Sequence, residues 1–285
     1  MPNTKQSRTF KVDGPQLDKF PHIEIPLASR TETAVIHHKE GTTEVKIPDD
    51  DQDKEKAIYI TSGIVTSFRL QKPGWIGFEF LPYIQPPEDL KDPFIIDNET
   101  ERDEIRERYK NIEEIVLNRD LNDPIFRLAL RRFNRSYNDE FKEDILIDLM
   151  ICFETLFIRA RESPKSGCLK CRVGSFLEYK DFINSSKIST VENDFERASR
   201  LRNCVVHEGK QYDLLFERYN RAIQRYPGTP WDFLLKLREY ARFSLQGYIK
   251  CVTTGNCPTT SAVKIKICNK WYPPNQRLDR NGFLC

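Results

Sequence analysis

Residues 145–157 are Ile145-Leu-Ile-Asp-Leu-Met-Ile-Cys-Phe-Glu-Thr-Leu-Phe157, and they lie in the most apolar helical pattern of the chain. The pattern predicts a helix over Glu140–Arg161. Because apolar side chains occur all round this helix, it should be buried at the centre of a domain. Asp148 and Glu154 interrupt the apolar run, which is too short and too charged to span a membrane. We therefore expect a helical domain built around this segment.

Helical periodicity continues on both sides of this segment. A break is expected at Gly167–Gly174. The signature Ser189-Thr-Val-Glu192 predicts a capping box that opens a long helix, and Gly209 is placed to end it. The other predicted helices are Glu99–Asn118, Ile125–Tyr137, Phe176–Asn184, Tyr212–Arg225 and Trp231–Cys251.

The N-terminal part has a different pattern, with short β-branched or aromatic runs separated by turn residues. These runs predict strands over Ile23–Ile25, Ala34–Ile36, Val45–Ile47, Ala57–Ile60, Ile64–Phe68 and Ile76–Phe80. His37 and His38 are neighbours on one such strand and should point to opposite faces, so they do not make a shared metal site. This part shows no catalytic constellation.

The sequence thus predicts an α+β protein in which a small antiparallel β-rich domain precedes an all-α helical bundle. We expect a frayed N-terminus over 1–19, the β-rich domain over 20–97, the bundle over 98–251 and an irregular cysteine-containing tail over 252–285. Four prolines between residues 82 and 93 mark the linker between the two domains. No internal repeat is visible.

Composition places the chain among globular proteins, with 39% hydrophobic and 31% charged residues. The N-terminus lacks the apolar core of a signal peptide, and no membrane span is expected, so a cytoplasmic location is the default. The net charge of +2 hides an asymmetry: residues 88–120 hold 12 acidic and 6 basic side chains, whereas residues 196–250 hold 11 basic and 6 acidic ones. The basic block suits a polyanionic partner, although solvated helix faces explain it equally well.

Eight cysteines are many for a cytoplasmic chain. Cys168 and Cys171 have the spacing of a zinc knuckle or a redox pair. A zinc site needs two further ligands, for which the tail offers cysteines, but no second pair with this spacing exists. Unconnected thiols are the simpler interpretation, and a zinc or redox sensor is the weaker one.

The candidate for chemistry is Arg202-Asn-Cys-Val-Val-His207, in the basic block and near the end of a predicted helix. Asn203 and His207 are one helical turn apart on one face, and Arg202 lies about 140° round the helix from His207. Arginine holds phosphate through a planar fork of donors, and histidine transfers protons near neutral pH. Together they suggest phosphodiester chemistry.

Two acids on the central helix are candidates to complete this site. Glu154 lies among large apolar residues, and an unpaired buried carboxylate is costly, so we expect it to pair with Arg202 or His207. Asp148 is a possible auxiliary residue. The alternative is a purely structural ion pair with an uninvolved helix-end histidine.

The order of these helices resembles the HEPN superfamily, and most closely the ApeA-like HEPN domains of prokaryotic defence systems. The resemblance covers roughly residues 122–250. It rests on Leu-Ala-Leu-Arg-Arg-Phe at 128–133, on the acid-bearing helix with Asp148 and Glu154, and on Arg202-Asn203 followed by His207. One departure is Glu208, which stands between His207 and Gly209 where the branch usually has histidine followed directly by glycine.

The resemblance implies a metal-independent endoribonuclease without a cofactor, in which two copies face each other across one composite cleft. It implies RNA as the substrate, a role as a toxin or antiphage (abortive-infection) effector, and a phage-derived trigger or an antitoxin as a further partner. The catalytic residues would be Arg202, Asn203, His207 and Glu154. The alternative is a non-catalytic module of the same fold that binds a nucleotide, RNA or a partner protein.

Overall fold

The structure is a computed structural model of the whole chain, and it describes most of the sequence. The described residues are 7–13, 15–17, 20, 22–27, 33–39, 42–48, 54–72, 77–78, 94–117, 124–137, 139, 141–158, 165–222 and 226–253. The chain divides into two compact units, residues 1–122 and 123–285. We describe each unit by itself.

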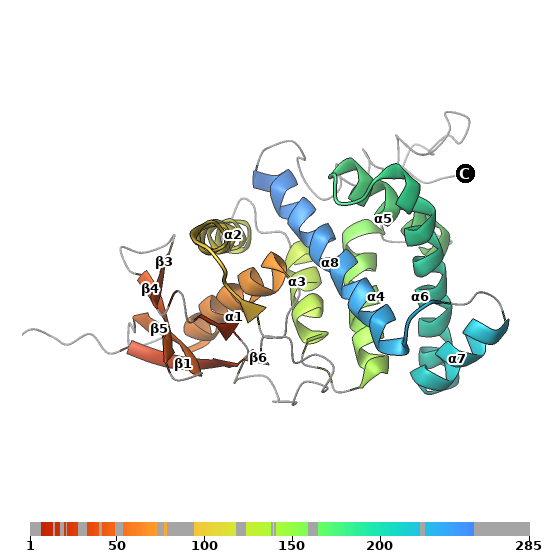
Figure 1. Cartoon of the computed structure of the whole chain (residues 1–285), viewed down its shortest axis with the longest axis horizontal. Coiled ribbons are helices and arrows are strands. Elements are labelled where there is room, and N and C mark those ends of the chain that lie inside the picture. Colours follow the sequence, from red (N-terminus) through yellow and green to blue (C-terminus); the bar gives the residue numbers. More distant parts are fainter. Residues whose placement is uncertain are drawn as a thin grey trace, which may run out of the picture. The chain divides into compact units, whose positions relative to one another are not determined.

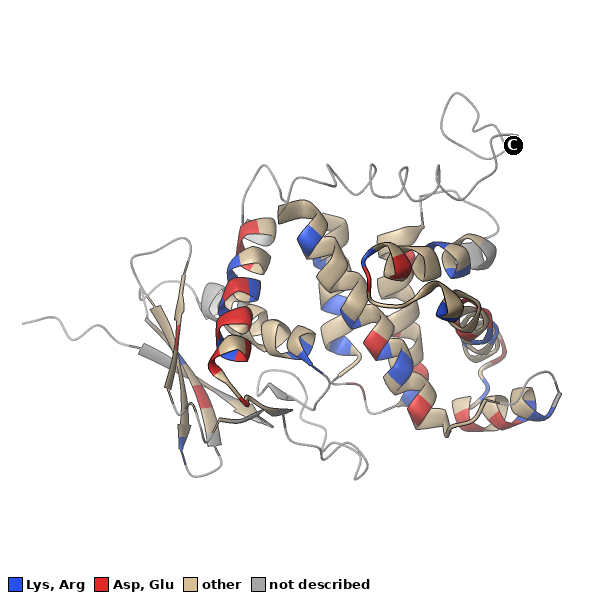
Figure 2. Cartoon of the chain, turned by 45° about the horizontal axis from the view of Figure 1, so that its top comes forward, with Lys and Arg blue, Asp and Glu red and all other residues tan. Residues whose placement is uncertain are grey.

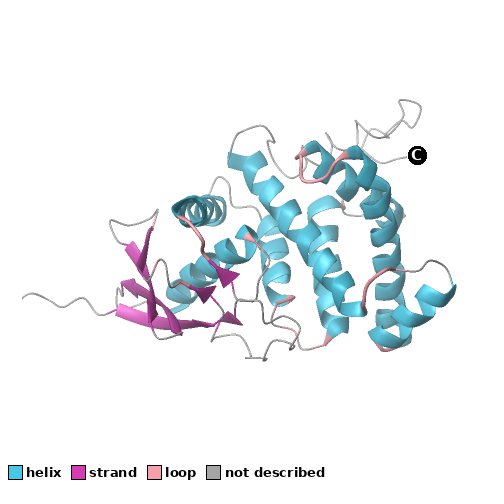
Figure 3. Cartoon of the chain, in the orientation of Figure 1, coloured by secondary structure: helices cyan, strands magenta, loops and turns pink. Residues whose placement is uncertain are grey.

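Unit 1 contains a five-stranded antiparallel sheet, and all strands among the described residues lie in this part of the chain (Figures 1 and 3). The strand order is β3-β4-β5-β1-β6, so that β3 is an edge strand. The bounds are β1 (Ser7–Asp13), β3 (His22–Pro26), β4 (Thr33–Lys39), β5 (Thr42–Pro48) and β6 (Gly77–Phe78). A separate parallel pair joins β2 (Pro15–Gln16) to β7 (Phe94–Ile95).

Burial alternates along these strands, as expected for a sheet with one covered face. Two helices pack on that face, α1 (Lys54–Gln71) and α2 (Glu99–Leu117). The core that they share with the sheet includes Ile23, Ile36 and Val45 from the strands, Ile64 from α1 and Tyr109 from α2. This arrangement confirms the three strands predicted over residues 23–25, 34–36 and 45–47.

The strands predicted over Ala57–Ile60 and Ile64–Phe68 are wrong, because both segments belong to α1. The buried residues Ile60, Ile64 and Phe68 recur every four positions, which is the period of a helix face. The hydroxyl of Thr66 also donates to the carbonyl of Ser62, 2.6 Å away, a bond made within a helix. Here helical periodicity and packing override the β-branched composition.

The expected frayed N-terminus over 1–19 is also corrected. Residues 7–13 form β1, which pairs with β5 on one side and β6 on the other. Phe10 and Val12 are buried in the core of unit 1, as is Leu17. Their burial supplies the hydrophobic free energy that orders this segment.

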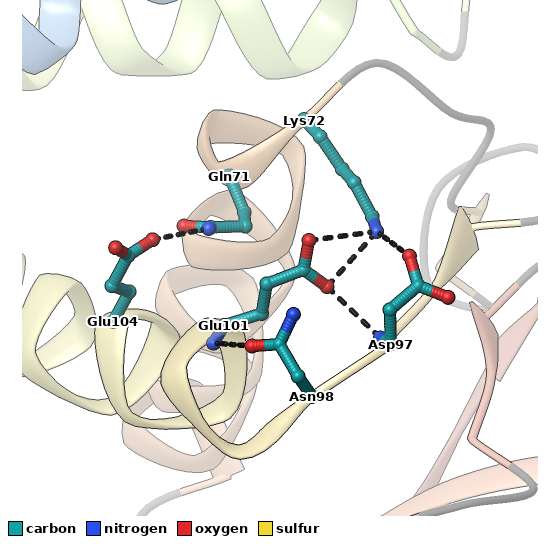
Figure 4. A network of polar contacts seen from close by, with 6 residues as sticks. All are labelled: Gln71, Lys72, Asp97, Asn98, Glu101 and Glu104. Atoms are coloured by element: carbon teal, nitrogen blue, oxygen red, sulfur yellow. Dashed lines mark hydrogen bonds and ion pairs between the residues drawn. The ribbon is translucent and has the colours of Figure 1, made fainter.

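The boundary between the units falls after Asn122, whereas the sequence placed it between residues 97 and 98. The difference is α2, which packs on α1 and contacts β3. Figure 4 shows the polar network that ties the start of α2 to the end of α1. Lys72 donates to Asp97 and Glu101 at 3.0 Å, and Asn98 caps the helix by accepting from the Glu101 amide at 3.0 Å.

Unit 2 is a bundle of helices around α4 (Lys142–Phe157), as the apolar stretch predicted (Figure 1). This helix packs against α3, α5, α6 and α8, and polar contacts also join its start to α7. The bounds are α3 (Pro124–Arg135), α5 (Lys165–Tyr179), the 3-10 turn η2 (Ser185–Lys187), α6 (Ile188–Glu208), α7 (Tyr212–Ala222) and α8 (Pro230–Thr253). Unit 1 and unit 2 together confirm the predicted α+β class.

The break expected at Gly167–Gly174 is wrong, since α5 continues through it. Glycine suits position 174 of this helix because a β-carbon there would come within 3.3 Å of Ile188. The missing side chain permits close packing on α6.

The capping box expected at Ser189–Glu192 is also wrong. Lys187 stands at the N-cap position and makes no side-chain capping bond. The turn η2 leads directly into α6 instead.

Two other predicted helix ends are confirmed. Gly209 adopts φ +61° and ends α6, and its amide donates to the carbonyl of Val205. Thr229 caps α8 reciprocally with Asp232, through bonds of 3.1 and 2.7 Å.

In the part of the chain that the structure describes, no helix combines the length and apolarity that a membrane span requires. The predicted tail lies outside the described residues from position 254 onward.

Candidate functional site

Arg202 on α6 faces Glu154 on α4. The Arg202 Nη2 atom lies 3.9 Å from Glu154 Oε1, and both side chains are about three-quarters buried, with 26% and 23% of their surface exposed. The contact follows from the packing of α6 on α4. We expected Glu154 to pair with Arg202 or His207, and in the fold its partner is Arg202.

Asn203 and His207 share the exposed face of the last two turns of α6. The Asn203 side-chain oxygen accepts a hydrogen bond from Arg202 Nη1 at 3.2 Å. Among the described residues, none makes a hydrogen bond or ion pair with His207, whose side chain is exposed. Asn203 thus orients Arg202 rather than the imidazole, and His207 is free to meet a ligand or another molecule.

The carboxylate of Glu208 has partners other than Asn203 and His207. It forms an ion pair with Lys210 and a hydrogen bond with the thiol of Cys204, one turn earlier on α6. The Lys210 contact and the thiol bond hold the pKa of Glu208 below its ordinary value. Burial and the same bond to Glu208 raise the pKa of the Cys204 thiol, which disfavours a reactive thiolate. Lys210 thus balances the negative charge of Glu208, the extra acid next to His207 in the sequence.

Asp148, the predicted auxiliary acid, has its partners on α3 instead of α6. Its buried carboxylate accepts from Arg132 Nη1 at 2.6 Å and lies 3.2 Å from Arg135 Nε. Asp148 and Glu154 are six residues apart on α4 and so face different neighbours. The structure places Asp148 in a salt-bridge cluster that joins α3 to α4.

A second carboxylate, Asp139, belongs to the same cluster. It lies in the connection between α3 and α4, with Arg135 Nε 3.5 Å away. Burial, together with a hydrogen bond to Asp148 and the charge of that acid, raises the pKa of Asp139 to about 7. Asp139 therefore holds a proton under mildly acidic conditions.

The basic block is only partly available to a polyanion. Arg197, Arg238 and Arg242 are buried, with side chains packed over aromatic rings. The side chain of Arg221 on α7 is 80% exposed, and Lys210 is about half exposed. Both signs of charge are spread over the helices of this unit (Figure 2). The sequence therefore overstated the positive surface of this unit.

The two cysteines with knuckle spacing lie on one helix. Cys168 is buried and Cys171 is exposed, and neither forms a disulfide. Within the described ranges, no three or more His, Cys, Asp or Glu side chains are grouped as metal ligands. The cysteines after residue 253 lie outside the described residues.

Sequence reasoning missed two groups beside the candidate site. Lys210 follows the helix end and holds Glu208. Arg218 on α7 lies close enough to Glu208 to add, after Lys210 and the Cys204 thiol, to the lowering of its pKa. Both residues lie in the basic block, but only the turn at Gly209 and the packing of α7 on α6 bring them to this end of the helix.

No family model matches this chain, and neither a curated protein nor a solved structure shows significant similarity to it.

Proposed function

We propose that the chain is a metal-independent endoribonuclease of the HEPN type, with a site formed by Arg202, Asn203, His207 and Glu154. The observation that supports it best is the Arg202–Glu154 pair between α6 and α4, with the exposed His207 near the end of the same helix. Glu154 helps to hold the guanidinium of Arg202 in place. No described residue makes a hydrogen bond or ion pair with the imidazole of His207, five residues further along the same helix.

The proposed reaction is attack of a ribose 2′-hydroxyl on the adjacent phosphorus. A base removes the 2′-hydroxyl proton, the new P–O bond forms, and the bond to the 5′-oxygen breaks as that oxygen takes up a proton. The products are a 2′,3′-cyclic phosphate and a 5′-hydroxyl. His207 transfers a proton, and Arg202 stabilises the charge that builds on the phosphate oxygens.

A second copy of the chain would complete the site, because the reaction uses both an acid and a base. Exposed apolar residues on α6 and on α7, the helix that follows it, support such a dimer: Val206 is 46% exposed and Leu214 is 65% exposed. Phe141, 61% exposed, lies at the start of α4, which Lys142 ties to Asp213 on α7 at 2.7 Å. We call these three side chains, Phe141, Val206 and Leu214, the apolar surface.

The test is incubation of the wild type and of His207→Ala with total RNA in the presence of EDTA, followed by mapping of the product ends. We expect the wild type to leave 2′,3′-cyclic phosphates and the variant to cleave at least about 100-fold more slowly, as the loss of a general acid or base predicts. Circular dichroism should show equal folding, because His207 is exposed.

Arg202→Ala and Arg221→Ala provide a matched pair, since each removes one guanidinium that lies 3.9 Å from a glutamate. We expect only the Arg202 change to abolish cleavage. Equal cleavage by wild type and His207→Ala, with EDTA present, would contradict the assignment.

A non-catalytic binding module is the second candidate. It is favoured by one feature of the single chain: the described residues bring no second histidine to Arg202. Light scattering at working concentration separates the two proposals. A monomer that binds RNA and leaves it intact supports the binding module, and a dimer that cleaves RNA supports the nuclease.

The biological role that fits an RNA-cleaving dimer is a toxin or antiphage effector in the cytoplasm. Such an enzyme needs control, which a phage-derived trigger or an antitoxin would supply. Expression of the wild type should arrest growth, and expression of His207→Ala should not.

A further inference from the structure

His22 and His37 form a pair on the exposed face of the sheet in unit 1. They are register partners on the antiparallel strands β3 and β4, although 15 residues separate them in the chain. Their Nδ1 atoms lie 3.4 Å apart, and the two rings meet at 63°. His38, the next residue along β4, is buried and forms a hydrogen bond with Thr43 at 2.8 Å, as expected for a side chain on the opposite face from His37.

This spacing matches the distance between two ligands of one metal ion. Zinc binds imidazole nitrogen at about 2.0–2.1 Å, and two such ligands at a tetrahedral angle are about 3.4 Å apart. The two nitrogens are also within hydrogen-bond range of each other, and a metal ion would replace that contact and lie off the line joining them, about 2.0–2.1 Å from each.

Two carboxylates lie beside the histidine pair. Glu24 Oε1 lies 3.3 Å from the other ring nitrogen of His22, Nε2, where a carboxylate commonly orients a metal-binding histidine. Glu44 is the register partner of His37 on β5 and adds a second negative charge. Lys46 on β5 brings one positive charge near His37, opposite in sign to these two carboxylates.

The backbone under the pair is fixed on both sides. β3 is the edge strand, and Arg106 on α2 donates to the carbonyl of Glu24 at 2.7 Å, which anchors that edge. β4 is paired on both of its sides, with β3 and β5. Rigid strands hold the two imidazoles in position before any ion arrives.

We propose that His22 and His37 bind one borderline divalent cation, such as Zn²⁺, through their Nδ1 atoms, with Glu24 orienting His22. Because no third described His, Cys, Asp or Glu joins the pair as a ligand, water or a donor from another molecule fills the remaining positions. This site lies in unit 1, and its residues are separate from those of the proposed nuclease site.

The test is a titration of the full chain with Co²⁺, followed by visible absorption and calorimetry. Co²⁺ bound to thiolates shows a sulfur-to-metal charge-transfer band, so binding to cysteines is distinguished from binding to imidazole. The matched variants are His22→Gln, His37→Gln and their combination, with His207→Gln as the control that removes another exposed histidine. Circular dichroism checks that each variant is folded.

We expect the wild type and His207→Gln to bind one Co²⁺ more, without the sulfur band, than the double variant. Each single variant should weaken this event at least tenfold, and Glu24→Gln should weaken it about tenfold. Zn²⁺ should displace the Co²⁺, and binding should weaken as the pH falls, because protons compete for the imidazoles. Equal stoichiometry and affinity in the wild type and the folded double variant would overturn the proposal.

Discussion

Arg202 and Glu154 lie 3.9 Å apart between α6 and α4, and each keeps about a quarter of its side chain exposed. Glu154→Gln keeps the shape of the side chain and removes the charge that holds the guanidinium. If Glu154 positions Arg202 for catalysis, kcat for RNA cleavage should fall about tenfold with little change in KM, because a small misplacement of a catalytic group is costly. The free energy of unfolding should change by less than about 1 kcal/mol.

The control for this variant is Glu217→Gln, which removes the partner of Arg221 on α7 at the same distance of 3.9 Å. We expect the control to leave kcat unchanged. An equal loss of kcat in both variants would show that the effect of Glu154 is a general one of charge.

Asp148 should stabilise the fold, because its buried carboxylate forms ion pairs with two arginines of α3. Asp148→Ala leaves Arg132 without its partner, and we expect a loss of about 3–5 kcal/mol in the free energy of unfolding, measured with urea. Asp213→Ala removes a carboxylate that is 52% exposed and pairs with Lys142, and it should cost less than about 1 kcal/mol. Similar losses for the two variants would show that burial does not set the strength of these pairs.

The Asp139 carboxyl should make stability depend on pH. Its pKa is raised from 3.8 to about 7 in the folded chain, so the folded state holds a proton that the unfolded state releases. The stabilisation from Asp139 is complete below about pH 4 and is lost as the pH rises through about 7. Urea unfolding between these pH values should therefore show a falling contribution in the wild type.

Asp139→Asn provides the comparison, because the amide cannot ionise and keeps the shape of the carboxyl. We expect the difference in unfolding free energy between the variant and the wild type to shift in favour of the variant as the pH rises from about 4 to about 7. Parallel pH profiles would contradict the raised pKa of Asp139.

Gly247 on α8 lies against the ring of Phe176 on α5. A β-carbon at position 247 would come within 2.8 Å of that ring, so Gly247→Ala should cost about 1–3 kcal/mol by overpacking, although alanine is the better helix former. Thermal unfolding measures the loss. Phe176→Leu in the same chain should recover part of it, and an unchanged midpoint in Gly247→Ala would contradict the close approach of the two helices.

The apolar surface should hold two copies together. Leu214→Glu places a charge on a side chain that is 65% exposed in the single chain, so the fold should survive while the proposed dimer weakens. We expect the dimer dissociation constant to rise at least tenfold, with RNA cleavage falling in parallel at low protein concentration. Tyr179→Glu, at an exposed apolar residue on α5, is the control and should leave the dimer intact.

Local signals predicted the helical unit well. The central position of residues 145–157, the end of α6 at Gly209 and the start of α8 after Thr229 are confirmed. Periodicity and capping residues act over a few positions, so a single sequence is enough to place them. The two strands predicted within residues 54–71 were wrong because β-branched residues at helical spacing fit both a strand and a helix. Packing on the sheet decides in favour of the helix.

The candidate site was also only partly visible in the sequence. Arg202 and His207 were identified because histidine is rare in this chain and one of the few stands near an arginine. The cost of burying a carboxylate suggested that Glu154 pairs with one of them. Nothing local distinguished Asp148 from Glu154, and only the packing of α4 assigns them to different neighbours. The His22–His37 pair depends on strand register, which the spacing of residues along the chain does not reveal.

By itself, the sequence determined the α+β class, the central apolar helix and the helix that carries Arg202, Asn203 and His207, because these depend on local composition and period. The tertiary structure decided which charges meet: Arg202 with Glu154, Asp148 with the arginines of α3, and His22 with His37. Pairings between distant residues depend on which faces the core buries, and burial is a property of the whole fold.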